Sequence, residues 1–172
     1  MTLALEVLLV LGVMGAFDTL VFHEWIGRLP AHSSAVSELR LHAARDAVYA
    51  VLFGSLAWLE PRGALVACYG VLFAAEIAIT LSDFLVEDRT RRLPGGERVA
   101  HALMGIVYGT LLALLAPFAL TWLREPAAFV RADHGLLSWA LSLFALGVAG
   151  SGVRDVLAAQ RLGFRLRAGQ QG

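Results

Sequence analysis

Residues 83–108 read DFLVEDRTRRLPGGERVAHALMGIVY, and residues 18–49 read DTLVFHEWIGRLPAHSSAVSELRLHAARDAVY. Both stretches follow one order: Asp, Leu-Val, an acidic or His pair, Arg-Leu-Pro, a linker, Glu-x-x-x-His-Ala, and Val-Tyr. Apolar matches arise easily in an apolar chain, whereas Asp, Glu, His, Pro and Tyr in the same order do not. The sequence therefore predicts a duplicated unit in which a helix ends, a loop follows and a second helix begins.

Long apolar stretches flank both units. The chain has 172 residues, of which 58% are hydrophobic, and its mean hydropathy is +0.69, whereas soluble domains are about 45–50% apolar. Stretches long enough to approach a bilayer span are found at about residues 3–22, 43–59, 63–83, 99–122 and 135–153. No signal-peptide cleavage pattern follows the first stretch. We therefore expect an integral membrane protein with a single transmembrane domain, residues 1–172.

The repeat predicts how these helices are arranged. We expect an all-α fold in which repeat 1 (about 3–59) and repeat 2 (about 63–122) form a pseudo-twofold four-helix transmembrane bundle. Both hairpins have the same topology, so their axis would lie along the membrane normal. Residues 135–153 add a fifth, peripheral transmembrane helix, in which Gly147, Gly150 and Gly152 permit close approach. A basic cytoplasmic tail, 154–172, follows.

The arginines predict the orientation. All fourteen basic residues are Arg. Only Arg62, Arg124 and Arg131 fall on one side of the five predicted spans, and the other eleven fall on the side of the repeat loops and the C-terminus. Basic loops stay in the cytoplasm. This predicts an outward N-terminus and a cytoplasmic C-terminus, in a membrane such as the bacterial inner membrane.

The polar matches predict a metal site near the cytoplasmic face. Residues four apart share a helix face, and polar groups inside a membrane normally face the bundle interior. The predicted ligands of a dinuclear centre are Asp18, Glu38, His42, Asp83, Glu97 and His101. Four carboxylates with two imidazoles suit two divalent ions, iron first and manganese or zinc next. Two turns deeper, Tyr49 and Tyr108 are candidate catalytic residues.

Two neighbouring pairs extend this hypothesis. His23-Glu24 and Glu87-Asp88 occupy similar places in the two repeats, and one residue of each pair could be a further ligand or could orient one. The ligand set resembles that of soluble di-iron carboxylate bundles. Their motif is Glu-x-x-His, however, and this chain has Glu-x-x-x-His, so no membership of that family is implied.

The predicted function is a membrane metalloprotein, of the di-iron oxidoreductase type, that oxidises, or hydrolyses, a membrane lipid or other lipid-soluble small molecule. One alternative is a haem b electron-transfer protein with His42 and His101 as axial ligands. A second alternative is a transport or proton-relay protein with Glu76, Asp83 and His101 as stepping residues. A third is an accessory subunit, whose polar layer only ties four helices together and in which Glu38 and Glu97 are ordinary first-turn acids. A redox partner and a homo-oligomer are compatible with the sequence. No nucleotide-binding or nucleic-acid-binding motif is found.

Overall fold

A computed structural model describes residues 1–169 of the chain, and helices make up 83% of the structure. The five long helices are α1 (Thr2–Asp18), α2 (Val36–Leu56), α3 (Leu65–Thr90), α4 (Gly95–Trp122) and α5 (Leu136–Gly169). The short elements are a π-helix η1 (Thr19–Ile26), the 3₁₀ turns η2 (Leu29–Ala31) and η3 (Ser33–Ala35), and the strands β1 (Leu59–Pro61) and β2 (Phe129–Arg131). The all-α prediction is confirmed.

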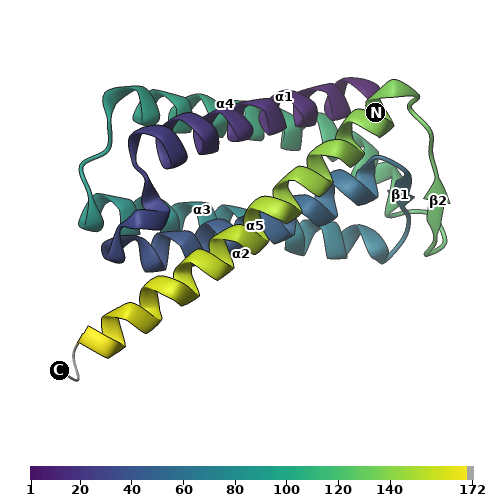
Figure 1. The fold of residues 1–172 in the computed structure, drawn as a ribbon. Helices are drawn as coiled ribbons and strands as arrows, with labels where there is room; N and C mark the ends of the chain where they lie inside the picture. The colour runs from purple at the N-terminus through teal and green to yellow at the C-terminus, as the bar shows by residue number, and fades with distance from the viewer. Residues whose placement is uncertain (170–172) are drawn as a thin grey trace.

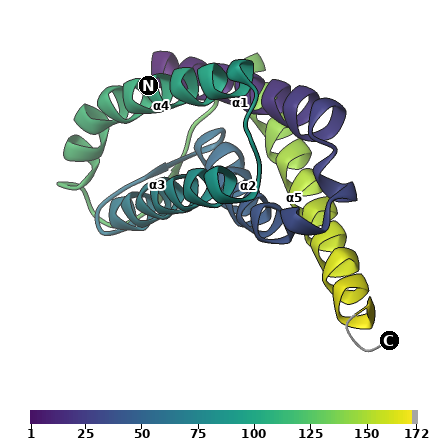
Figure 2. The same ribbon diagram turned by 90° about the vertical axis from the view of Figure 1, so that its left-hand side faces the viewer.

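The long helices form two layers. Helix α1 packs beside α4, and α2 packs beside α3, while α5 crosses α2 diagonally along a long interface (Figures 1 and 2). At one end of the bundle, β1 and β2 pair antiparallel, with Leu59 opposite Arg131. The opposite end holds the two connections between α1 and α2 and between α3 and α4. The candidate site lies at that second end.

Four helical segments are long and apolar enough to cross a membrane among residues 1–169, which indicates a membrane protein. They are Thr2–Ile26, where α1 continues into η1, and Leu65–Thr90, Gly95–Trp122 and Leu136–Ala168. The fifth predicted span, about 43–59, does not meet that standard. It belongs to α2, which is long enough but carries several charged side chains, among them Arg45 and Asp46.

The apolar core fills the bundle between the site and the two-stranded sheet of β1 and β2. Its most deeply buried side chains come from α1, α2, α4 and α5, and they include Leu5, Leu8, Leu52, Phe53, Leu111 and Leu141. Between helices of membrane-spanning character, close van der Waals packing holds such a core together, because lipid is as apolar as the side chains themselves. The bundle is thus anchored by packing at one end, while polar groups gather at the other.

Helix α5 is longer than the predicted 135–153, because the helix continues through most of the predicted tail. Ala159 and Leu162 of that extension pack against Leu29 and Leu39. Residues 170–172 of the predicted tail lie outside the described residues. Gly152 permits close approach to α2, since a Cβ there would lie 3.0 Å from that of Asp46.

Candidate metal centre

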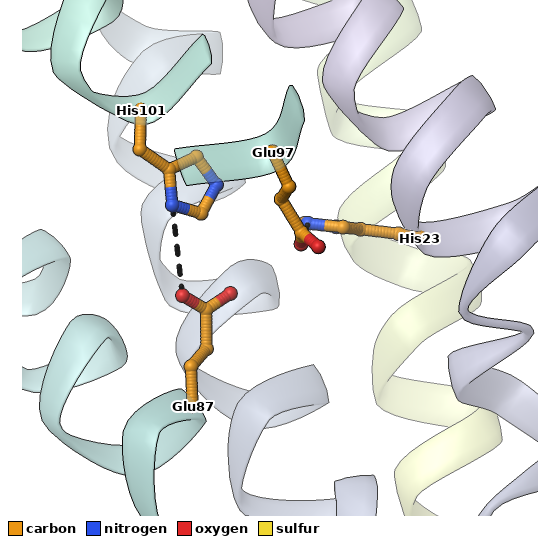
Figure 3. A group of neighbouring side chains, drawn as sticks. All are labelled: His23, Glu87, Glu97 and His101. Carbon is orange, nitrogen blue, oxygen red and sulfur yellow. Dashed lines mark ion pairs between the residues drawn. The ribbon is translucent and has the colours of Figure 1, made fainter. Parts of the chain in front are cut away.

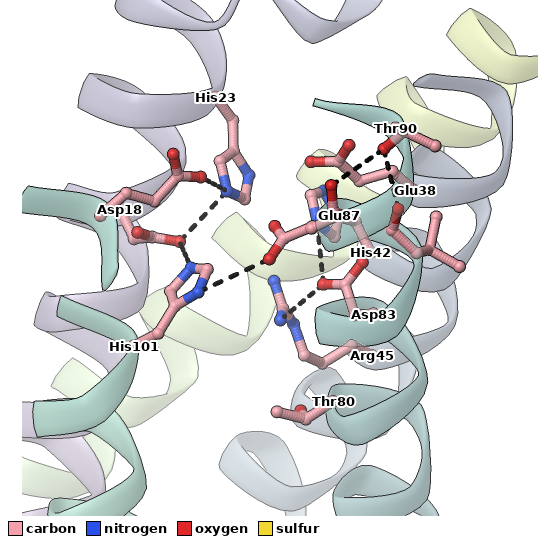
Figure 4. A network of polar contacts seen from close by, with 12 residues as sticks. Asp18, His23, Glu38, His42, Arg45, Thr80, Asp83, Glu87, Thr90 and His101 are labelled. Atoms are coloured by element: carbon pink, nitrogen blue, oxygen red, sulfur yellow. Dashed lines mark hydrogen bonds and ion pairs between the residues drawn. The ribbon is translucent and has the colours of Figure 1, made fainter. Parts of the chain in front are cut away.

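Eight ionisable side chains meet where four helices end or begin, and all are at most 8% exposed. They are Asp18 at the end of α1, His23 in η1, Glu38 and His42 at the start of α2, Asp83 and Glu87 near the end of α3, and Glu97 and His101 at the start of α4. Figure 3 shows four of these side chains, and Figure 4 shows the wider network. Each group belongs to the first or last turns of its helix, so the helix ends bring them together.

The π-helix η1 places His23 in this cluster. Residues five apart on an α-helix point roughly 140° away from each other. A π-helix has i→i+5 hydrogen bonds, which bring such residues onto one side, and the Gly27 amide donates such a bond to the carbonyl of Phe22 over 2.7 Å. As a result, His23 Nε2 lies 3.3 Å from Asp18 Oδ2, although the two residues are five positions apart in the sequence.

Imidazole and carboxylate atoms of the two repeats approach each other in crossed pairs. His42 Nε2 lies 3.0 Å from Asp83 Oδ2, and His101 Nε2 lies 3.4 Å from Asp18 Oδ2. His101 also has its Nδ1 atom 3.6 Å from Glu87 Oε2, the pair joined by a dashed line in Figure 3. Acids therefore lie against imidazoles both between the repeats, as in the pairs of His42 with Asp83 and His101 with Asp18, and within repeat 2, as in the pair of His101 with Glu87.

Most of these close approaches are not hydrogen bonds. Within residues 1–169, several buried atoms of the cluster have no hydrogen-bond partner: Asp18 Oδ1, both ring nitrogens of His23, His42 Nε2, Asp83 Oδ1, Glu87 Oε2 and His101 Nε2. Buried polar atoms are normally bonded, and each exception requires a physical explanation. Donor atoms that converge without the geometry of a hydrogen bond are typical of ligands that share a metal ion.

Two overlapping sets of four side chains have the spacing that a metal ion requires. The first set is His23, Glu87, Glu97 and His101, and the second is His23, Glu38, His42 and Glu87. Within each set the four ligand atoms lie within 4.8 Å of one another. His23 and Glu87 belong to both sets, so they would be shared by two neighbouring ions.

Arg91 binds the carboxylates on the outer side of the cluster. It is the residue directly after α3, and its backbone is extended, so its guanidinium turns back toward the bundle. The guanidinium donates to Glu38, Glu87 and Glu97 over distances from 2.5 to 3.3 Å. Burial lowers the pKa of Arg91, but the hydrogen bonds to Glu97 and Glu38 outweigh that effect, so its pKa lies above the usual value.

Negative charge exceeds positive charge in the cluster. Arg45 Nη1 donates to Asp83 Oδ2 over 3.2 Å, which makes it the second guanidinium at the site (Figure 4). Five carboxyl groups therefore face two guanidinium groups, and three negative charges remain when all five are ionised and the imidazoles are neutral. Buried charges that lack partners are very costly. Two divalent cations would offset this excess.

The structure brings all six predicted metal ligands into this cluster, but Asp18 and Asp83 belong to neither of the two sets with metal-ligand spacing. Whether any of the six binds metal stays a prediction. Of the two neighbouring pairs, it brings in His23 and Glu87, whereas Glu24 forms an ion pair with Arg154 and Asp88 is exposed. From the sequence, Arg91 could be recognised only as one of several basic residues near the connection between α3 and α4. The i,i+4 spacing of Asp83 and Glu87 is the sequence signal that favours Glu87.

The two predicted catalytic tyrosines lie deeper than the cluster. Tyr49 donates a hydrogen bond of 3.0 Å to Glu76 Oε1, and Tyr108 donates one of 3.1 Å to the carbonyl of Phe73. Both tyrosines line a cavity of about 940 Å³, whose lining also includes Asp18 and His101. The cavity therefore connects the tyrosines with the cluster, and their catalytic role stays a prediction.

Comparisons of the chain with protein-family models, with curated proteins and with solved structures found no match. The class of protein is therefore defined by its own fold and site: an all-α chain with apolar helices of membrane-spanning length and a buried cluster of carboxylates and imidazoles.

Proposed function

We propose that this chain is an integral membrane metalloprotein that holds two divalent metal ions, iron first, in the cluster of eight side chains. The observation that carries the proposal is the convergence of buried imidazole and carboxylate atoms that lack hydrogen-bond partners among residues 1–169. Three imidazoles and five carboxylates match the donors that iron, manganese and zinc prefer. Dinuclear carboxylate sites are found in the cores of four-helix bundles, projecting from facing helices.

The duplicated sequence supports a dinuclear site. A twofold axis relating the repeats would exchange α1 with α3 and α2 with α4, and it would exchange the α1–α4 interface with the α2–α3 interface. Both interfaces exist. The pair of His42 with Asp83 then corresponds to the pair of His101 with Asp18. Likewise, the stacking of His23 on His42 corresponds to the contact of Glu87 with His101.

The membrane setting supports a lipid-soluble substrate. Helices α1, α3, α4 and α5 have membrane-spanning length, and we infer that α2 crosses with them, since it packs against α3 and α5. Arg62, Arg124 and Arg131 lie toward the end of the bundle that holds β1 and β2, and the other arginines lie toward the site. By the rule that basic loops stay inside, the site lies near the cytoplasmic face. We therefore infer that the N-terminus lies outside.

The chemistry we assign is oxidation of a lipid-soluble molecule. Two iron ions would supply the capacity to activate dioxygen, the oxidant, whereas zinc would supply hydrolytic chemistry. The chain's own groups position that chemistry: Arg91 orients the glutamates Glu38 and Glu97, and Arg45 orients Asp83. The cavity beside Asp18 and His101 would admit the substrate.

One observation favours a different function. Arg91 already gives hydrogen bonds to both oxygens of Glu38 and of Glu97. These two glutamates are therefore satisfied without a metal, as they would be in an accessory subunit whose polar layer only ties the helices together. The ring nitrogens of His23, His42 and His101 are not explained in this way, which is why we favour the metalloprotein.

Elemental analysis of the detergent-purified protein tests the proposal. After anaerobic loading with Fe²⁺ and gel filtration, we expect about two ions per wild-type chain and almost none in the His42→Ala/His101→Ala double variant. His32→Ala is the matched control, because His32 is exposed and lies in the connection between α1 and α2. Near-zero metal in wild type and double variant alike would establish the accessory subunit. A Soret band in the absorption spectrum would establish the haem alternative.

A further inference from the structure

The cavity beside the cluster is large and mostly apolar. Its volume is about 940 Å³, at the upper end of the range for small-molecule sites. It lies among α1, α2, α3, α4 and α5, and its apolar walls include Leu11, Phe53, Ile77, Phe84 and Met104. Such walls suit the body of a lipid-soluble molecule.

Glycines keep part of this volume open. Gly15, Gly105, Gly147 and Gly150 line the cavity, and a Cβ built on any of them would have no neighbouring atom within 4 Å among the described residues. Glycine inside a helix costs about 1 kcal/mol relative to alanine. The packing of the helices does not require glycine at these four positions.

A buried carboxylate lies in the cavity wall, away from the cluster. Glu76 is 4% exposed, and its Oε1 atom accepts hydrogen bonds from Tyr49, over 3.0 Å, and from Thr80, over 2.8 Å. Among residues 1–169, neither Arg nor His forms an ion pair with Glu76, and both of these hydrogen bonds end on Oε1. A buried carboxylate without a cationic partner is costly, so a group that donates hydrogen bonds to Oε2 would stabilise it.

We propose that this cavity binds an apolar molecule that carries a hydrogen-bond donor, a hydroxyl or an amine, and that Glu76 accepts the hydrogen bond from that donor. The inference deepens the proposed function and rests on it for the chemistry, because it names the substrate class of the same site. Glu76 precedes Asp83 by seven residues on α3, which corresponds to about 10 Å along the helix. A molecule held at Glu76 would therefore present a part of its apolar body to the cluster, beside Asp18 and His101.

Binding of radiolabelled 1-dodecanol to the protein in lipid nanodiscs tests this inference. Dodecylamine and the methyl ether of dodecanol compete as unlabelled probes, since the first keeps a donor and the second has none. We expect the ether to compete roughly tenfold less well than dodecanol, because a hydrogen bond to a charged group contributes about 1.5 kcal/mol or more. Stronger competition by the amine than by the alcohol would identify a cationic ligand, and the reverse a neutral one.

Variants separate the carboxylate from the cavity walls. Glu76→Leu is expected to reduce dodecanol binding to the level of the ether, while Asp88→Asn, an exposed acid on the same helix, leaves it unchanged. Gly105→Leu fills open space in the cavity and is expected to abolish binding. Gly70→Leu is its control, because Gly70 is equally open but lies outside the cavity.

Metal content distinguishes failure of this inference from failure of the proposed function. The binding assay is run on metal-loaded protein, on metal-free protein and on His42→Ala/His101→Ala, and Glu76→Leu and Gly105→Leu are analysed for bound iron. Normal iron content with equal competition by alcohol, amine and ether would overturn the inference alone. A protein that takes up no metal but still prefers the alcohol or the amine to the ether would confirm the binding site and contradict the proposed metal chemistry. Equal dodecanol binding by wild type and Gly105→Leu would show that the cavity is not the site.

Discussion

Replacing Arg91 by methionine tests whether the glutamates around it are ionised together. Met has a similar length and no charge, so the change removes the guanidinium while keeping most of the volume. Glu38, Glu87 and Glu97 are each at most 1% exposed, and they would lose every hydrogen bond that Arg91 donates. Removing one partner of a buried ion pair costs about 3–5 kcal/mol.

The expected loss lies at the lower end of that range. The side chain of Arg91 is 18% exposed, so water already screens part of the interaction, and about 3 kcal/mol is the reasonable magnitude. For a chain of this size, 1 kcal/mol shifts the midpoint of thermal unfolding by about 2–4 °C. The metal-free Arg91→Met protein should therefore unfold roughly 6–12 °C below the wild type.

The assay is thermal unfolding in detergent, followed by circular dichroism, with and without Fe²⁺ under anaerobic conditions. Arg92→Met is the control, because Arg92 is the next residue and is exposed. Metal should recover most of the loss in Arg91→Met, since divalent ions replace the missing positive charge at the same carboxylates. Equal midpoints for the two metal-free variants would refute the reasoning, because they would show that the glutamates do not need the guanidinium.

Metal stoichiometry, helix packing and membrane insertion give three more tests. His23 belongs to both ligand sets, so His23→Ala should lose both ions, whereas His42→Ala leaves one set intact and should retain about one ion per chain. Gly152→Leu should lower the thermal midpoint by roughly 4–8 °C, because overpacking against α2 costs about 2 kcal/mol. Ile106→Cys, in a Cys68→Ser background, should not react with a charged maleimide in lipid vesicles and should react once the protein is unfolded in sodium dodecyl sulfate, since Ile106 is exposed in the middle of an apolar helix.

Each of these tests has a matched control. His32→Ala should keep both ions. Gly150→Leu should leave the midpoint nearly unchanged, because a Cβ at Gly150 has open space, and Arg98→Cys should react in vesicles open at both faces as well as in sodium dodecyl sulfate. Retention of two ions by His23→Ala would contradict the shared-ligand assignment. Labelling of Ile106→Cys in vesicles would contradict the membrane setting.

The features that follow α-helical periodicity could be predicted from the sequence. Glu38 with His42 and Glu97 with His101 are i,i+4 pairs at helix starts, and the structure buries all four together. The duplicated order of polar residues placed these pairs in one layer. The helices themselves follow from apolar runs, so most of their limits were also predictable, apart from the start of α2 and the ends of α3 and α5, where the helices continue into polar sequence.

The features that depend on a local departure from α-helical geometry could not be predicted. In a gapless alignment of the segments after Asp18 and Asp83, His23 falls opposite Asp88, which is exposed, and Phe22 falls opposite Glu87. The π-helix shifts the phase of the first repeat by one residue, so that His23 occupies the place that Glu87 occupies in the second. No simple sequence pattern signals such an insertion, because π-helical turns are rare and occur mostly as single interruptions within α-helices.

Asymmetry between the repeats determines which groups of the cluster remain free for a metal. With glutamate at the position of His23 as well as at Glu87, the cluster would carry one more carboxylate and one imidazole fewer. Arg91 and Arg45 have no charged counterparts in the other repeat, where Gly27 and Met104 stand. Arg91 satisfies the outermost glutamates, which leaves the imidazoles, Asp18 and Asp83 with buried atoms that lack partners within the described chain. The charge that remains is what two divalent ions would neutralise, and this is the physical reason to measure metal before any enzymatic activity.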